Sequence, residues 1–159
     1  MMIPVLEPRE YQKDIYTQLQ LEGKHTHILC WHRRLGKTIA ILSAISWLMF
    51  KKPNAYLYLY PWLKQAREVI WEGKLEDGRS IIDTIFPKEI VKRKNISTMT
   101  IELVNGSTIR LGGADNIDSS MGGQYATIVL DEAAMIERDV YGYLQPIIDS
   151  NGGDIIIVS

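Results

Sequence analysis

The sequence feature that most restricts the fold of this 159-residue chain is Gly36-Lys37-Thr38, together with the segments on either side of it. Residues 26–31 are mostly apolar and predict a short buried strand, whereas residues 38–50 carry no charge and are apolar on nearly every face of a helix. Phosphate binding needs backbone N–H groups at a helix N-terminus, a lysine that reaches the β and γ oxygens, and a hydroxyl for Mg²⁺. The three segments therefore predict a phosphate-binding loop in an α/β protein.

The loop departs from the strict phosphate-loop pattern, which places a glycine five residues before Gly36, where this chain has Trp31. A bare Gly-Lys-Thr is weak evidence because it also occurs by chance, but its position between a strand and a helix strengthens it. The residues expected to bind the nucleotide here are Arg33, Arg34, Leu35, Gly36, Lys37 and Thr38.

A second apolar run, residues 127–130, ends in Asp131-Glu132 and is typical of a fully buried strand in a parallel sheet. An aspartate at such a strand end can hold Mg²⁺, and the adjacent Glu132 can polarise the attacking water as a general base. Two acids that merely end a buried strand are the alternative. Combined with Gly36-Lys37-Thr38, the pair predicts nucleotide hydrolysis.

The remaining pattern alternates strands and helices. We expect a helix between Pro8 and Gly23, a strand at 55–60, a helix from Leu63 to Gly73, a hairpin of strands 99–104 and 107–111 turned by Asn105-Gly106, and a helix over about 133–144. Residues 155–158 are consecutive aliphatics, which favours a strand in the middle of a sheet. Because the chain stops at Ser159, we expect it to be the N-terminal portion of a longer protein, with an edge strand at a natural terminus as the alternative.

Charge is unevenly distributed along the chain although the net charge is only −1. Residues 1–110 carry 17 Lys and Arg against 11 Asp and Glu, whereas residues 111–159 carry one Arg against eight acids. A site in which bases bind phosphate and acids bind a metal ion explains this separation, and scatter over a solvated surface is the alternative. Cys30 is the only cysteine, which indicates a reducing compartment, and the longest uncharged apolar run is too short to cross a membrane.

Several segments together resemble the ATPase domain of the large terminase subunit, the motor that packages DNA into the heads of tailed phages. That family has a deviant phosphate loop with an arginine three residues before the glycine, where this chain has Arg33. Also similar are the segments 58–66 (Tyr-Leu-Tyr-Pro-Trp-Leu-Lys-Gln-Ala), 131–134 (Asp-Glu-Ala-Ala) and 155–159 (Ile-Ile-Ile-Val-Ser). The resemblance implies an α/β P-loop NTPase fold of the additional-strand, catalytic-glutamate type, with a mainly parallel sheet, flanking helices and a β-hairpin insertion.

The resemblance also implies roles for single residues, with ATP and Mg²⁺ as cofactors. Residues 6–12 are similar to an adenine-recognising segment shared with superfamily 2 helicases, in which Gln12 reads the adenine edge and Arg9 lies beside it; sequence alone makes Gln12 a solvent-facing helix residue. Arg33 would act on the γ-phosphate, Lys37 and Thr38 on phosphate and Mg²⁺, Asp131 on Mg²⁺ and Glu132 as the base. Ser159 would begin the motif that couples hydrolysis to movement.

The partners implied by the resemblance are double-stranded DNA, the portal protein, the small terminase subunit and further copies in a ring, in the cytoplasm of a bacterial host and without a membrane. Residues 1–159 would form the ATPase domain, without the nuclease domain of the full-length family members. A helicase or translocase lobe of superfamily 2, and a nucleotide-binding assembly fragment without turnover, are the alternative functions. The arginine supplied by a neighbouring subunit stays open among Arg79, Arg93, Arg110 and Arg138.

Two other groups are weaker candidates for function. His25, His27, Cys30 and His32 lie within eight residues, but the alternation of side chains along a strand places Cys30 opposite the first two, which argues against zinc. The basic run of Lys88, Lys92, Arg93 and Lys94 favours a solvated loop over a contact with DNA phosphates.

Overall fold

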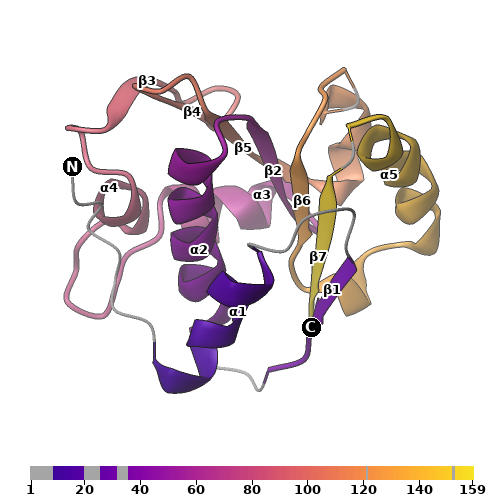
Figure 1. Cartoon of the computed structure of the whole chain (residues 1–159), viewed down its shortest axis with the longest axis horizontal. Coiled ribbons are helices and arrows are strands. Elements are labelled where there is room, and N and C mark those ends of the chain that lie inside the picture. Colours follow the sequence, from indigo (N-terminus) through magenta and orange to yellow (C-terminus); the bar gives the residue numbers. More distant parts are fainter. Residues whose placement is uncertain (1–8, 20–25, 32–35, 121, 152) are drawn as a thin grey trace.

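The computed structural model describes residues 9–19, 26–31, 36–120, 122–151 and 153–159. Seven strands form one sheet in the order β1-β7-β6-β2-β5-β4-β3 (Figure 1). The strands are β1 (Thr26–Leu29), β2 (Ala55–Tyr60), β3 (Val91–Asn95), β4 (Thr100–Leu103), β5 (Thr108–Gly113), β6 (Thr127–Leu130) and β7 (Asp154–Val158). The helices are η1 (Glu10–Gln12), α1 (Lys13–Gln18), α2 (Lys37–Lys51), α3 (Leu63–Ala66), η2 (Arg67–Trp71), α4 (Ile81–Ile85), η3 (Ala114–Ser120), η4 (Ala133–Met135) and α5 (Arg138–Asn151).

Five neighbouring strands, β1, β7, β6, β2 and β5, are parallel, which confirms the predicted α/β class. The additional strand β7 lies between β1, which precedes the phosphate loop, and β6, which ends at Asp131. Residues 155–158 therefore occupy the interior position that their aliphatic sequence predicts, paired on one side to β1 and on the other to β6.

The two faces of the sheet carry separate hydrophobic cores, and β2 shows how the sequence divides between them. Tyr56, Tyr58 and Tyr60 point into the core that contains α1, α2 and α4, whereas Leu57 and Leu59 point into the core that contains α5. This follows from the period of two along a strand. Figure 1 shows α2 and α5 on opposite sides of the sheet. All five side chains are buried because helices cover both faces of this central strand.

The hairpin predicted around Asn105-Gly106 is present as the antiparallel pair β4 and β5. Gly106 has a φ of +89°, the left-handed backbone that favours glycine, and the Leu103 amide closes the turn onto the Ser107 carbonyl. One strand of this insertion also pairs in parallel with β2 over residues 55–60 and 108–113. The hairpin is therefore joined to the main sheet.

The basic run forms a strand and not the expected solvated loop. Residues 91–95 make up β3, which pairs antiparallel with β4 at the edge of the sheet. Lys92 and Arg93 both lie within ion-pair distance of Glu102 on β4, at 3.0 and 3.5 Å. The prediction was wrong because lysines and arginines, which are common on exposed edge strands, mask the weak alternation of such a strand.

Strand β1 differs from the predicted buried strand. It lies at the other edge of the described sheet, ends at Leu29, and exposes 66% of Ile28. An apolar run cannot distinguish an edge strand from a central one, because the two differ in how many neighbours pair with them.

The helices match the predicted pattern with shifted limits. Residues 63–71 are helical, but the second half is the π-helical turn η2. The helix expected over about 133–144 is two elements, the short turn η4 and then α5, which begins at Arg138 and extends to Asn151. Helix α4 was not expected, because its five residues are too few to show a helical period.

Candidate nucleotide site

The two sequence motifs meet where α2 begins and β6 ends. Thr38 Oγ1, in the first turn of α2, donates a hydrogen bond of 2.9 Å to Asp131 Oδ2, across 93 positions of sequence. Asp131 is 2% exposed and directly follows the buried strand β6. The fold therefore brings the predicted hydroxyl and carboxylate ligands of Mg²⁺ into direct contact.

Two tyrosines of β2 complete this cluster. The Tyr58 hydroxyl donates to Asp131 Oδ2 over 2.6 Å, and the Tyr60 hydroxyl lies 3.0 Å from Thr38 Oγ1. They reach the site because β2 is the immediate neighbour of β6 and because residues 58 and 60 lie on the same face as α2. Sequence analysis did not assign Tyr58 a role; the one available signal was the alternation of tyrosine and leucine in residues 56–60.

Both tyrosines keep their protons at neutral pH. Burial is the main cause that raises the pKa of Tyr58 well above 10.0, and the negative charge of Asp131 raises it further. Burial also raises the pKa of Tyr60, again with a contribution from Asp131. Tyr58 therefore acts as a hydrogen-bond donor toward the carboxylate.

Glu132 follows Asp131 in a left-handed backbone conformation, with a φ of +52°. Its backbone N–H donates to Asp131 Oδ1 over 2.8 Å, so that both carboxylate oxygens of Asp131 have donors. The half-buried Glu132 side chain belongs to the same end of β6. Its predicted role as the general base stays a prediction.

The phosphate loop is described at its two ends, Trp31 and Gly36. Gly36 caps α2 with a φ of +67°, a conformation that glycine adopts without strain. The Lys37 ammonium donates to the Trp31 carbonyl oxygen over 2.9 Å, so the lysine side chain lies back along the loop. Arg33, Arg34 and Leu35, and with them the expected arginine contact with the γ-phosphate, lie outside the described residues.

Gln12 lies at the phosphate loop and not in solvent, which corrects the reading from helical pattern alone. It is 7% exposed, its Oε1 accepts the backbone N–H of Arg9 at 3.0 Å, and its Nε2 lies 3.7 Å from the position of a Cβ on Gly36. The same segment packs Tyr11 edge-on against Trp31, with ring centres 5.8 Å apart, while the Arg9 guanidinium donates to the Tyr11 hydroxyl. The expected adenine-recognising segment is therefore adjacent to the expected phosphate loop.

Ser159 lies beside the strand that leads into the loop. Its backbone N–H donates to the Leu29 carbonyl over 2.9 Å, and its carbonyl accepts from the Trp31 N–H over 3.2 Å. The expected start of the coupling motif therefore contacts both sides of the point where β1 becomes the loop.

The donor set fits a magnesium ion. Mg²⁺ prefers oxygen ligands and is usually held by one or two protein groups together with phosphate and water. Thr38 and Asp131 supply such oxygens. Within the described part of the chain, no three His, Cys, Asp or Glu side chains come together as a metal site; His25 and His32 lie outside it.

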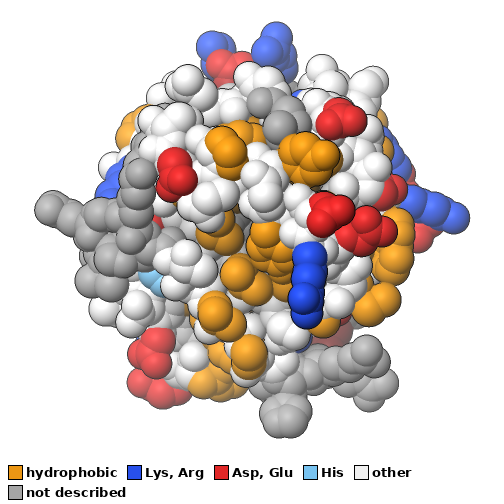
Figure 2. All heavy atoms as spheres, turned by 90° about the vertical axis from the view of Figure 1, so that its right-hand side faces the viewer, with side chains coloured by type: hydrophobic (Ala, Val, Ile, Leu, Met, Phe, Trp, Pro, Cys, Tyr) orange, Lys and Arg blue, Asp and Glu red, His pale blue; other side chains and the backbone are white. Residues whose placement is uncertain are grey.

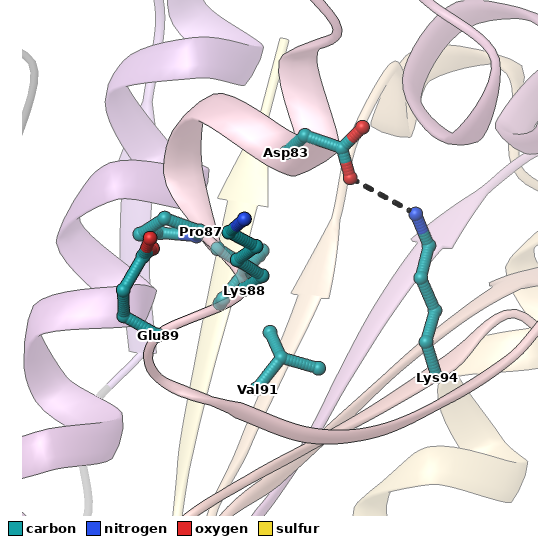
Figure 3. Close-up of a pocket in the computed structure, with 7 residues that line it drawn as sticks. Asp83, Pro87, Lys88, Glu89, Val91 and Lys94 are labelled. Atoms are coloured by element: carbon teal, nitrogen blue, oxygen red, sulfur yellow. Dashed lines mark hydrogen bonds and ion pairs between the residues drawn. The ribbon is translucent and has the colours of Figure 1, made fainter.

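Two hollows lie away from these residues. A cavity of about 490 Å³ lies between α4 and β3, where Lys94 bonds to Asp83 over 3.1 Å (Figure 3). A groove of about 510 Å³ is lined by Trp62, Asp115, Met135, Glu137, Asp139 and Tyr143, among others. Figure 2, which looks onto the α5 side, shows hydrophobic and acidic side chains exposed together. Three carboxylates in the groove would repel phosphate, which argues that the triphosphate lies at α2 and not here.

The fold and this site define the class of protein as a P-loop nucleoside triphosphatase with an additional strand between the two motif-bearing strands. Within that class, the chain belongs to the family described as "Terminase large subunit, T4likevirus-type, N-terminal", whose model matches residues 32–158. The predicted resemblance is thereby confirmed. Among the described residues, no helix has both the length and the apolar character needed to cross a membrane.

Individual relatives agree with this assignment. The chain is 28% identical over 135 residues to the large terminase subunit of Escherichia phage T5, which covers 82% of this chain and 29% of that protein. The structure is similar to the large terminase ATPase domain of Thermus phage P74-26, with a TM-score of 0.69 and 19% identity over 96% of this chain and 64% of that one. The large terminase of another thermophilic bacteriophage, solved with ATP-γ-S, matches with a TM-score of 0.67 and 14% identity over 94% of this chain and 37% of that one. The chain thus spans less than two thirds of the length of each relative.

Proposed function

We propose that this chain hydrolyses ATP as the motor part of a large terminase and couples hydrolysis to the movement of double-stranded DNA into a procapsid. The observation that carries the proposal is the 2.9 Å hydrogen bond from Thr38 Oγ1 to Asp131 Oδ2. It joins the first turn of the helix after the phosphate loop to the acidic end of β6. These are the two parts that a P-loop enzyme must bring together around a triphosphate and its metal ion.

The roles of the residues follow from their positions. Lys37 has three donors, of which one is directed to Trp31, so the others are free to bind phosphate oxygens. Thr38 and Asp131 would hold Mg²⁺, which when bound neutralises charge on the β and γ oxygens. Glu132 would accept a proton from the attacking water. Gln12 would bind the adenine edge, with Arg9 fixing its amide, and Arg33 would stabilise charge on the γ-phosphate.

The comparisons support ATP as the nucleotide. The Thermus phage relative is described as a large terminase ATPase domain, and the relative from another thermophilic phage was solved with ATP-γ-S and with ADP. We infer that residues 1–159 belong to an ATPase domain and that any nuclease activity requires residues outside this chain.

The partners follow from family membership. A packaging motor must act on double-stranded DNA and dock on the portal of the procapsid, and we propose that this protein does so with the small terminase subunit, as a ring of copies in the cytoplasm of a bacterial host. Ser159, which contacts the strand leading into the phosphate loop, would connect the state of the nucleotide to the residues that move DNA.

The test is ATP hydrolysis by this chain and by the same protein continued past Ser159, each with and without double-stranded DNA. We expect turnover, increased by DNA, in the longer protein. Nucleotide binding without phosphate release above background in both would instead support a binding module for assembly. Absence of nucleotide binding in both would overturn the proposal.

A further inference from the structure

The two tyrosines of β2 touch the expected magnesium ligands more closely than any role in packing requires. Tyr58 is 0% exposed, and its hydroxyl is 2.6 Å from Asp131 Oδ2. A phenylalanine at this position would fill the same core space, so the hydroxyl contributes through its hydrogen bond. A bond from a neutral donor to a carboxylate is about twice as strong as one between neutral groups.

The hydrogens of the cluster can be assigned one by one. Thr38 has a single hydroxyl hydrogen, and its bond to Asp131 uses it. The hydrogen between Thr38 and Tyr60 must therefore come from Tyr60, while Tyr58 donates its own hydrogen to Asp131. Thr38 Oγ1 then accepts one hydrogen bond and keeps one lone pair.

The same assignment leaves room on the carboxylate. Oδ2 of Asp131 accepts from Thr38 and Tyr58, and Oδ1 accepts from the Glu132 N–H. A carboxylate has about four lone-pair positions, so one stays open on Oδ1. Both expected ligands are thus held in place and each retains an acceptor position for a metal ion or its bound water.

We propose that Tyr58 and Tyr60 are positioning residues for magnesium: Tyr58 fixes the Asp131 carboxylate and Tyr60 fixes the Thr38 hydroxyl, so that the two oxygens are set before the ion and nucleotide bind. The inference rests on the proposed nucleotide site and deepens it. Hydrogen-bond partners behind metal ligands commonly contribute 10- to 100-fold to metal affinity. Tyr58, which donates to a charged group, contributes more than Tyr60, which donates to a neutral one.

The test uses the Mg²⁺ concentration that half-saturates the tightening of ADP binding, measured with a fluorescent ADP analogue on the purified protein in its longest nucleotide-binding form. Tyr58→Phe should raise this concentration about tenfold, and Tyr60→Phe should raise it about threefold, since it loses a weaker bond. Binding of the analogue in EDTA should be unchanged in both variants, because neither hydroxyl faces the base or the phosphates in this proposal.

Tyr56→Phe is the matched control. Tyr56 lies on the same strand and the same face, is 2% exposed, and donates its hydroxyl to the Lys52 carbonyl over 2.7 Å, away from the site. It removes one buried tyrosine hydroxyl from β2 without touching Asp131 or Thr38. Thermal unfolding of all three variants separates lost stability from lost metal binding.

Equal Mg²⁺ requirements in Tyr58→Phe, Tyr60→Phe and Tyr56→Phe, with the wild-type protein binding nucleotide in a Mg²⁺-dependent manner, would overturn this inference and leave the proposed function standing. If Tyr58→Phe does not fold, Tyr60→Phe decides by the same criterion. A wild-type protein without Mg²⁺-dependent nucleotide binding would overturn the proposed function and this inference together.

Discussion

The Lys37 ammonium bonds to the backbone carbonyl of Trp31, six residues earlier in the chain and 2.9 Å away. Trp31 occupies the position at which strict phosphate loops have a glycine, and its carbonyl is directed at the lysine side chain. The departure from the strict pattern therefore leaves a backbone acceptor for Lys37 on the strand side of the loop. This bond orients the lysine along the loop before any phosphate is bound.

Replacement of this lysine is the first prediction. Lys37→Ala should abolish nucleotide binding, because it removes the cation at the expected β and γ oxygens. Titration with a fluorescent ATP analogue measures the effect. Lys51→Ala is the control, since Lys51 ends the same helix, is exposed, and contacts only the Trp47 ring among the interactions described for it. Comparable binding in Lys37→Ala and Lys51→Ala would contradict the placement of phosphate at the start of α2.

The second prediction concerns the expected general base. Glu132→Gln should leave ATP binding intact and lower turnover by at least about 100-fold, because the amide cannot accept the proton of the attacking water. Phosphate release under saturating ATP measures this in the protein continued past Ser159. Glu137→Gln changes an exposed carboxylate a few residues further on and should leave turnover unchanged. Turnover of Glu132→Gln close to that of the wild type would move the role of the base to another residue.

The third prediction follows from the position of Gln12 beside Gly36. Gln12→Ala should weaken ATP binding and reduce the preference for ATP over GTP, because the side-chain amide is the group expected to read the adenine edge. Competition of ATP and GTP for a bound fluorescent analogue measures the preference. Gln18→Ala, which changes an exposed residue of α1, is the control. An unchanged preference in Gln12→Ala would assign base recognition to other residues.

Local sequence carries much of this fold because several elements depend only on local chemistry. Gly36-Lys37-Thr38 predicts a helix start, Asn105-Gly106 a tight turn, and the aliphatic run before Asp131 a buried strand. In each case, a few adjacent residues determine the backbone that forms.

The missed features depend on which segments become neighbours. Ile28 is exposed because β1 has one strand partner among the described residues, and Gln12 is buried because its helix packs on the phosphate loop. The contact of Tyr58 with Asp131 requires that β2 lie next to β6 in one particular register. Composition and periodicity describe each segment separately, so they do not determine such pairings.

The last prediction concerns stability in alkaline solution. Burial is the main cause that raises the pKa of five tyrosines, Tyr16, Tyr56, Tyr58, Tyr60 and Tyr125, above 10.0. Above about pH 10, the unfolded chain releases these phenolic protons while the folded protein retains them. The unfolded state then binds fewer protons, so the free energy of unfolding must fall as pH rises.

Each tyrosine contributes up to about 1.4 kcal/mol per pH unit to this decrease. Tyr56→Phe should therefore make the decrease above pH 10 shallower by up to that amount, because its phenol no longer titrates in either state. Urea unfolding of the wild-type protein and of Tyr56→Phe at pH 8, 9, 10 and 11 measures the slopes. Between pH 8 and 9, the difference in stability between the two proteins should stay constant, since the phenol is protonated in both states. A constant difference up to pH 11 would show that the Tyr56 phenol titrates alike in the folded and unfolded protein.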